Sequence, residues 1–136
     1  MAADFKQLAK DIQALLSAVS SLPTYETEPP REKGGAVSVE PPFLVYSAVP
    51  QSKQDESGTY LIDLITDIWT RGGWDEAFTK AGAINAALDE QVYNVESGVI
   101  VANENGAIFN RIERDAADER LRRMQSQYVL RYYPNS

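Results

Sequence analysis

The segment Thr59-Tyr-Leu-Ile-Asp-Leu-Ile-Thr-Asp-Ile-Trp69 carries the clearest strand pattern in this chain. Side chains of a strand alternate between its two faces. At that spacing one face is apolar and carries Tyr60, Ile62, Leu64 and Ile68. The other face mixes carboxylates with apolar groups: Leu61, Asp63, Ile65, Asp67 and Trp69. We expect a strand that is apolar on one side and half-apolar on the other to be central in its sheet.

A helix is predicted directly after this strand, over residues 74–91, where Gly72-Gly73 lets the chain turn. One apolar stripe recurs at three- and four-residue intervals: Trp74, Phe78, Ala81, Ile84, Leu88 and Val92. Asp75 is the expected N-cap. Strand and helix together predict the seed of a two-layer domain.

An amphipathic helix is also predicted at the N-terminus, over residues 3–20. Its stripe consists of Phe5, Leu8, Ile12, Leu15, Leu16 and Val19. Asp4 and Gln7 have capping-box spacing. We expect this stripe to pack on the sheet of the same domain, the alternative being a neighbouring subunit.

Residues 21–42 are predicted to lack regular structure. Pro23, Pro29-Pro30, Gly34-Gly35 and Pro41-Pro42 interrupt this polar segment. A loop of this length in a small domain is usually functional or disordered. Two interpretations stay open: an extended arm exposed to solvent, or an arm that becomes ordered against a partner subunit.

The remaining strands are predicted in pairs. Residues 43–49, ended by Pro50, should form an antiparallel hairpin with the central strand through the polar loop 51–58. Residues 98–102 and 107–112 should form a second hairpin around Asn105-Gly106. The last strand should run from about Leu121 to Tyr133, although a short helix over residues 116–124 is an alternative. This order predicts a single α+β domain over residues 1–136, with an antiparallel sheet flanked by the two helices.

Composition excludes several kinds of chemistry. The chain has no cysteine and no histidine, which removes disulfides, thiolate catalysis, cysteine or histidine zinc sites and histidine acid–base catalysis. Its net charge of −7 argues against a dedicated nucleic-acid binder. It has no apolar run as long as the roughly 20 residues of a membrane helix. The N-terminus is too acidic for a signal peptide, so we expect a soluble cytoplasmic protein.

The carboxylate pair Asp63 and Asp67 is the most enzyme-like feature. Four residues of strand at about 3.3 Å each place them about 13 Å apart, too far to share one metal ion or one glycosidic bond. Residues 115–119 lack the pattern of a calcium loop, and residues 71–73 lack that of a phosphate loop. We therefore predict no enzyme and no cofactor. Tyrosines and arginines along the last strand instead favour a protein interface, with Tyr128 assigned to the core.

The central segment resembles the tail-completion, or tail terminator, proteins of long-tailed bacteriophages. The resemblance rests on Pro42-Phe-Leu-Val-Tyr46, on Tyr60-Leu-Ile-Asp-Leu-Ile-Thr-Asp-Ile-Trp69 and on the following helix with Ala77, Ala81, Ile84 and Leu88. Arg111-Ile-Glu-Arg-Asp115 and Tyr128-Val-Leu-Arg-Tyr132 fill the last two places of the family pattern. The resemblance covers about residues 40–133. Its motifs are patterns of residue type and include no catalytic signature. The arm over residues 21–42 is longer and richer in proline than the family pattern.

The resemblance implies a hexameric ring at the head-proximal end of the tail tube, which stops tube polymerisation and offers a head–tail joining surface. Its partners would be further copies of itself, the tail tube protein and a head–tail connector or head-completion protein. DNA would pass through the lumen without specific binding. The protein would then be part of the virion neck, assembled in the cytoplasm of a bacterial host.

By analogy, sheet edges and the arm would make subunit contacts, and the charged loops 51–58 and 114–120 would face the tube or the connector. The candidate interface residues are Asp63, Asp67, Arg111, Arg114, Asp115, Arg120, Arg123, Arg131 and Tyr133. The alternatives are another neck protein, such as a head-closure or connector-adaptor component, and a small acidic regulatory protein. A small hydrolase using Asp63 or Asp67 is a further alternative.

Overall fold

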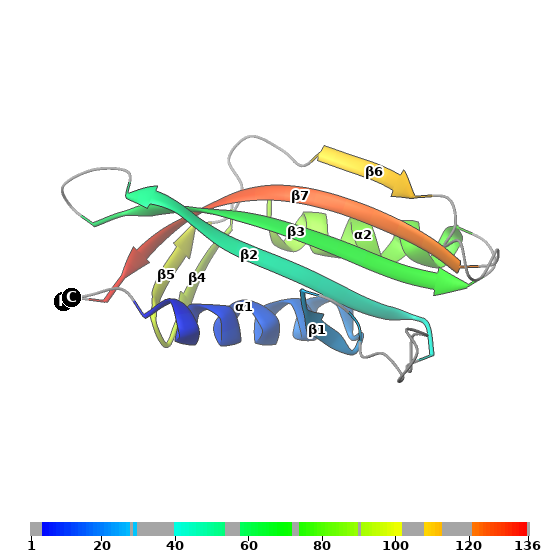
Figure 1. Ribbon diagram of the computed structural model, residues 1–136, viewed down its shortest axis with the longest axis horizontal. Coiled ribbons are helices and arrows are strands. Elements are labelled where there is room, and N and C mark those ends of the chain that lie inside the picture. Colours follow the sequence, from blue (N-terminus) through cyan, green and yellow to red (C-terminus); the bar gives the residue numbers. More distant parts are fainter. Residues whose placement is uncertain are drawn as a thin grey trace.

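The computed structural model describes residues 4–27, 29, 40–53, 58–71, 74–89, 91–101, 108–112 and 121–135, with the backbone alone for 51–53, 108–112 and 121. Within these ranges the frame is a seven-stranded sheet of order β1-β2-β3-β7-β5-β4, with β6 also paired to β7 (Figure 1). The strands are β1 Thr24–Glu26, β2 Phe43–Lys53, β3 Tyr60–Arg71, β4 Val92–Val95, β5 Gly98–Val101, β6 Ile108–Ile112 and β7 Leu121–Pro134. Two helices complete the described part: α1 Phe5–Ser20 and α2 Asp75–Ala87. The α+β class is confirmed.

The strand β3 is central, as its sequence predicts. It pairs antiparallel with β2 on one side and with β7 on the other, over almost its whole length. Its even-numbered residues on the apolar face lie in one core cluster with residues of both helices, and Ile62, Leu64 and Ile68 are each at most 1% exposed. Thr66 and Thr70 are also buried on that face. The sequence prediction did not include these two polar residues. Threonine is β-branched and suits a strand, so buried and less buried side chains still alternate along most of β3.

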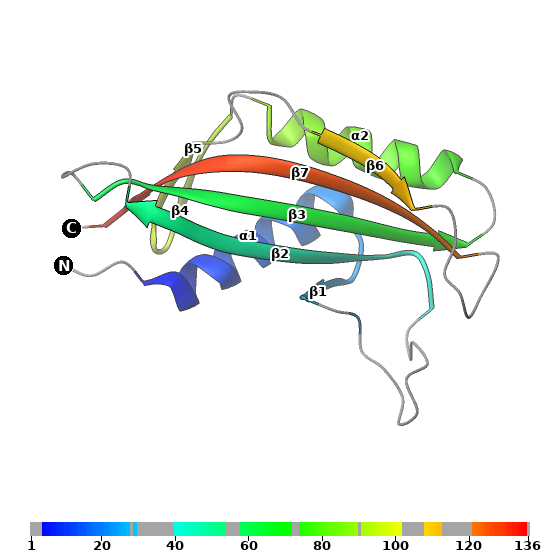
Figure 2. The same ribbon diagram turned by 45° about the horizontal axis from the view of Figure 1, so that its top comes forward.

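Both helices cover this same face of β3, and both views show them on one side of the long strands (Figures 1 and 2). The capping prediction for α1 is confirmed, because the Asp4 carboxylate accepts a hydrogen bond from the Gln7 N–H at 3.0 Å. Packing on the chain's own sheet is confirmed as well: the Tyr46 hydroxyl of β2 donates to the Ala9 carbonyl at 3.0 Å. The two helices meet where the Lys80 ammonium donates to the Ser20 carbonyl.

The prediction for the second helix is wrong at both ends. Trp74 is the N-cap and Asp75 is the first helical residue, and α2 ends at Ala87 instead of reaching Gln91. The buried stripe runs through Ala77, Ala81, Ile84 and Leu88. The prediction placed Phe78 in the core, but Ala77 is buried there and Phe78 is 50% exposed. Val92 belongs to β4, where it is 59% exposed.

The prediction that regular structure stops over residues 21–42 is wrong for Thr24–Glu26. This strand, β1, pairs in parallel with Leu44–Tyr46, so the sheet is mixed and not purely antiparallel. Residues 28 and 30–39 of the predicted arm lie outside the described residues. Pro50 does not end β2, which continues to Lys53 after a register shift. Proline is tolerated in a strand at an edge or a bulge, where its missing N–H removes no ladder hydrogen bond.

The predicted second hairpin is also wrong. The turn Asn105-Gly106 lies outside the described residues, but β5 and β6 both pair antiparallel with β7 and so run in the same direction. They cannot be the two arms of one hairpin. The fourteen residues of β7 are long enough to pair with both. The tight hairpin joins β4 to β5 through Glu96 and Ser97.

The predicted last strand is confirmed, since β7 spans Leu121–Pro134. Met124, Tyr128, Leu130 and Tyr132 are buried at alternate positions, as expected. The alternative helix is wrong for residues 121–124, and residues 116–120 lie outside the described part. No helix among the described residues is long and apolar enough to cross a membrane.

Candidate interaction surface

The face of the sheet opposite the helices is the candidate interaction surface, and we call it the helix-free face. It is formed by the odd-numbered residues of β2, β3 and β7, which are direct neighbours in the register. Five of the nine interface candidates from the sequence lie on it: Asp63, Asp67, Arg123, Arg131 and Tyr133. They share this face because side chains at alternate positions of neighbouring strands point the same way. Asp67 and Arg123 lie toward one end of it, and Asp63, Arg131 and Tyr133 lie toward the other.

One end of the helix-free face is an aromatic cluster that neither α1 nor α2 covers. The rings of Phe43 and Trp69 stack with centroids 5.3 Å apart, and Tyr25 of β1 meets Phe43 edge-on at 6.0 Å. Phe43, Trp69 and Val45 are at most 4% exposed. Pairs of this geometry stabilise a fold beyond their buried area. The mixed face of β3 therefore has a small core of its own.

A charged group closes this cluster. The Arg123 guanidinium lies 4.7 Å from the centre of the Trp69 ring, and its Nη2 lies 3.3 Å from a carboxylate oxygen of Asp67. The Gln125 amide also donates to Asp67, at 3.5 Å. The Asp67 side chain is 13% exposed and that of Arg123 is 27% exposed, so the pair is largely shielded from water. One cation thus contacts both a carboxylate and an aromatic face.

Burial raises the pKa of the Asp67 carboxyl, and the nearby Arg123 guanidinium and Gln125 amide partly offset that rise. Desolvation disfavours the charged form of an acid, whereas an opposite charge favours it. Asp63 has different surroundings, since it lies between Val49 and Val129 in the register. The two carboxylates are therefore members of separate groups, as the spacing along the strand predicts.

The other end of the helix-free face exposes apolar side chains. Val49 is 55% exposed, Val129 is 39% exposed and Tyr133 is 41% exposed. Asp63 lies between Val49 and Val129 in the register, and half-buried Leu61 and Ile65 flank Asp63 on the same face of β3. Arg131 is the direct neighbour of Leu61. Exposed apolar side chains next to charged groups are typical of a site for protein contacts.

Four sequence candidates do not join this surface in the described part of the chain. The backbone of Arg111 in β6 pairs with that of Met124, and its side chain lies outside the described part. Arg114, Asp115 and Arg120 lie outside the described residues altogether. The sequence reasoning missed Val49 and Val129, although their alternation with buried neighbours was a signal that could have found them. In the described ranges, no three acidic side chains are grouped so that they could hold a metal ion.

Comparison with known proteins gives a likeness in structure only. No protein-family model matches the sequence, and no curated protein matches it. A solved chain from the "Virion of native gene transfer agent (GTA) particle" is 20% identical, with a TM-score of 0.57 over 96% of this chain and 91% of that chain. A second solved chain is 12% identical, with a TM-score of 0.56 over 96% of this chain and 92% of that chain. At such identities the likeness shows a shared fold.

Proposed function

We propose that this protein is a structural component of a phage-like virion and acts as its tail terminator. It caps the head-proximal end of the tail tube as a hexameric ring, stops the tube from growing and offers a surface for head–tail joining. It works through binding geometry, without turnover and without a cofactor. Its place is the neck of the virion, which is assembled in the cytoplasm of a bacterial host.

The observation that carries this proposal is the likeness in fold, over 96% of the chain, to a component of a gene transfer agent virion. The resemblance of residues 40–133 to tail-completion proteins rests on sequence motifs and also favours this role. Two independent comparisons, one of motifs and one of shape, thus favour the same class of particle.

The helix-free face supplies the proposed contact surface. Val49, Val129 and Tyr133 are exposed there beside Asp63 and Arg131. Tyrosine and arginine are enriched at interfaces, and contacts that bury apolar side chains from water supply much of their energy. We assign this face to contact with the tail tube protein or with the head–tail connector, and DNA passes through the ring without specific binding.

The test is a tube-polymerisation assay with purified tail tube protein, followed by negative-stain electron microscopy and mass photometry. We expect wild-type protein to stop tube growth and to form a ring at one end of each tube. Val129→Glu places a charge on the helix-free face and should abolish capping. Ala83→Glu places the same charge on an exposed site of α2 and should leave capping intact.

Tubes that continue to grow beside wild-type protein would overturn the terminator role. Binding to a connector or head-completion protein without any effect on tubes would then favour a different neck protein. A stable monomer that binds neither tail tubes nor the connector would favour an acidic regulatory protein. Equal loss of capping in both charge variants would show that the helix-free face is not the contact surface.

A further inference from the structure

The outer edge of β2 is paired over only part of its length. The Leu44 N–H donates to the Pro23 carbonyl at 2.8 Å, and the Tyr46 carbonyl accepts from the Thr27 N–H at 2.7 Å. The even-numbered residues of β2 therefore direct their backbone groups toward β1. Thr27 then takes a positive φ of 71°, and β1 ends with Glu26 opposite Tyr46. Figure 2 shows how short β1 is beside β2.

The next backbone groups at this edge are the N–H and carbonyl of Ala48 and the carbonyl of Pro50. No described residue pairs with them. Unpaired donors and acceptors at a sheet edge are a template for an added strand. The edge is regular up to Pro50, since Ala48 and Pro50 keep their register with β3.

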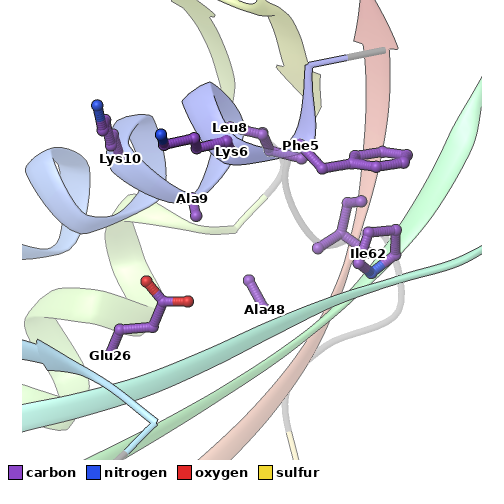
Figure 3. Close-up of a pocket in the computed structure, with 9 residues that line it drawn as sticks. Phe5, Lys6, Leu8, Ala9, Lys10, Glu26, Ala48 and Ile62 are labelled. Atoms are coloured by element: carbon purple, nitrogen blue, oxygen red, sulfur yellow. The ribbon is translucent and has the colours of Figure 1, made fainter. Parts of the chain in front are cut away.

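A groove of about 430 Å³ lies between this edge and the start of α1 (Figure 3). Its apolar lining comes from both elements and from β3: Phe5, Leu8, Ala9, Ala48, Pro50 and Ile62. Ala9 of α1 and Ala48 of β2 point toward one another across it (Figure 3). Lys6, Lys10 and Glu26 complete the lining. A strand added at the β2 edge would direct alternate side chains into this groove.

The sheet ends on its other side at β4, the last strand of its order, and no described strand pairs with the outer edge of β4. Tyr93 and Val95 pack against the core, so Val92 and Asn94 point to the other face of β4. Val92 has the largest exposed fraction, 59%, of the large hydrophobic side chains in the described part. An exposed valine on an edge strand is a feature that natural edges usually avoid.

The charges around the two edges are complementary. Lys6 and Lys10 lie beside the β2 edge on α1. Exposed Asp89 precedes β4, and exposed Glu96 follows it. Glu26, the acidic group of the groove, already accepts a hydrogen bond from the Tyr46 hydroxyl at 3.4 Å. Opposite charges that flank two edges favour their approach and disfavour pairing of like edges.

We propose that β4 of one copy adds to the open β2 edge of the next copy, with Val92 seated in the groove. The second copy turns the Val92 side of β4 toward the groove of the first copy. The helices of the second copy then lie on the other face of the joined sheet, away from α1 of the first copy. The contact joins two different surfaces of the same chain, and such a head-to-tail contact closes into a ring when the rotation fits. It rests on the proposed function in that it specifies how that ring is built.

Disulfide trapping tests this contact directly, since the chain has no cysteine of its own. Ala48→Cys protein is mixed with Val92→Cys protein under mild oxidation, and the rate of dimer formation is followed by non-reducing electrophoresis. Directly opposed residues of paired strands come close enough for a disulfide. We expect a cross-linked dimer to form at least about tenfold faster than with the control pairs, because docking raises the effective concentration of the two thiols.

Two control pairs test whether cross-linking depends on the β2 edge and on the side of β2 that faces the groove. Val49→Cys replaces Ala48→Cys in one, because Val49 lies on the same strand but on the helix-free face. Ala83→Cys replaces it in the other, on the exposed side of α2. Lys6→Cys tests the groove from an exposed site on α1, so the result does not depend on how well β2 tolerates substitution. Thermal unfolding of each variant verifies that it folds.

Equal cross-linking rates for the test pairs and the controls would overturn the proposed pairing. If wild-type protein still caps tail tubes in that case, the pairing fails and the terminator role stands. If the cross-link forms selectively while tubes remain uncapped, the pairing stands and the terminator role fails. Faster cross-linking of Val49→Cys than of Ala48→Cys would overturn the seating of Val92 in the groove.

Discussion

The two faces of β3 differ in how they are shielded from water. On the covered face, Ile62, Leu64 and Ile68 pack with residues of both helices in one cluster. On the helix-free face, Trp69 is shielded by ring stacking and by a cation, while Val129 next to Asp63 stays 39% exposed. Among the described residues, α1 and α2 shield one face almost completely, whereas an aromatic cluster shields only one end of the other face. The opposite end keeps exposed apolar side chains, which makes it the candidate contact surface.

The sharpest test of this difference compares two isoleucines of β3. Ile68→Ala should lower the free energy of unfolding by about 2–5 kcal/mol, because Ile68 is fully buried under the helices. Ile65→Ala on the helix-free face should cost roughly 1 kcal/mol, because that side chain is only half-buried. Urea denaturation of both variants measures the difference. Equal losses would mean that the two faces are shielded equally well.

The second prediction concerns the charge pair of the helix-free face. Arg123→Met should lower the free energy of unfolding by about 1–3 kcal/mol at neutral pH, since it leaves the shielded Asp67 carboxylate without its cation. Asp67→Asn with Arg123→Met should recover part of that loss, because no unpaired charge then remains. Urea midpoints of the single and double variants provide the measurement. A double variant no more stable than Arg123→Met alone would contradict the argument.

The pH dependence of stability follows from the same pair. Burial raises the pKa of Asp67 above its ordinary value of 3.8. The folded protein therefore binds this proton more tightly than the unfolded chain does, and stability falls as pH rises from that value through the folded pKa. Arg123→Met should raise the pKa further, so the fall should become larger and extend to higher pH. Asp67→Asn should remove this part of the pH dependence of the free energy of unfolding. Denaturant unfolding at a series of pH values measures it.

A smaller effect is expected where the sheet meets α1. Tyr46→Phe should cost about 1 kcal/mol, because it removes the hydrogen bond from the Tyr46 hydroxyl to the Ala9 carbonyl. Tyr133→Phe on the helix-free face is the matched control and should change stability little, since Tyr133 is 41% exposed. Thermal unfolding compares the two. A loss from Tyr133→Phe as large as that from Tyr46→Phe would contradict the prediction.

Titration at high pH tests Tyr46 separately. Burial, reinforced by the Glu26 carboxylate, raises the pKa of Tyr46 from 10.0 to about 12. The contribution of the protonated hydroxyl is therefore fully present below pH 10.0 and is lost as pH rises through about 12. Ultraviolet titration of tyrosinate should show one fewer late-titrating group in Tyr46→Phe. Loss of an early-titrating group, with the late-titrating groups unchanged, would show instead that Tyr46 ionises early.

The smallest effect is expected for an exposed ion pair. Arg71 lies 3.0 Å from Glu40, but the Glu40 side chain is 87% exposed, in contrast to the shielded Asp67. Glu40→Gln should change the free energy of unfolding by less than about 0.5 kcal/mol, because water and salt screen such pairs. Chemical denaturation at low and high salt measures it. A loss comparable with that of Arg123→Met would mean that exposure does not separate the two pairs.

Local patterns in the sequence predicted much of this arrangement. The alternation along residues 59–69 identified the central strand and both of its faces, and Asp4 with Gln7 identified the start of α1. Five interface candidates share one face of the sheet because they alternate along strands that the sequence predicted. Patterns of this kind are reliable because one face of the element is buried, which fixes the phase of its side chains.

Three features were mispredicted because they depend on distant partners. β1 has only three residues and forms on the edge that β2 offers to it. The stripe of α2 is shifted because alanines face the core, and alanine gives a weak apolar signal. β5 and β6 share one long partner in β7, which the strong turn signal Asn105-Gly106 does not reveal. Tertiary context overrides local preference in each case.

The α+β class, the central strand and the preference of α1 for its own sheet follow from the sequence alone, as does the lack of histidine and cysteine chemistry. Each of these depends on residue type or on the period of one segment. The contacts of Arg123 with both Asp67 and Trp69, and the apolar groove beside the β2 edge, appear only in the folded structure. Those contacts join residues of different elements, and the register between strands fixes them, which no single segment encodes.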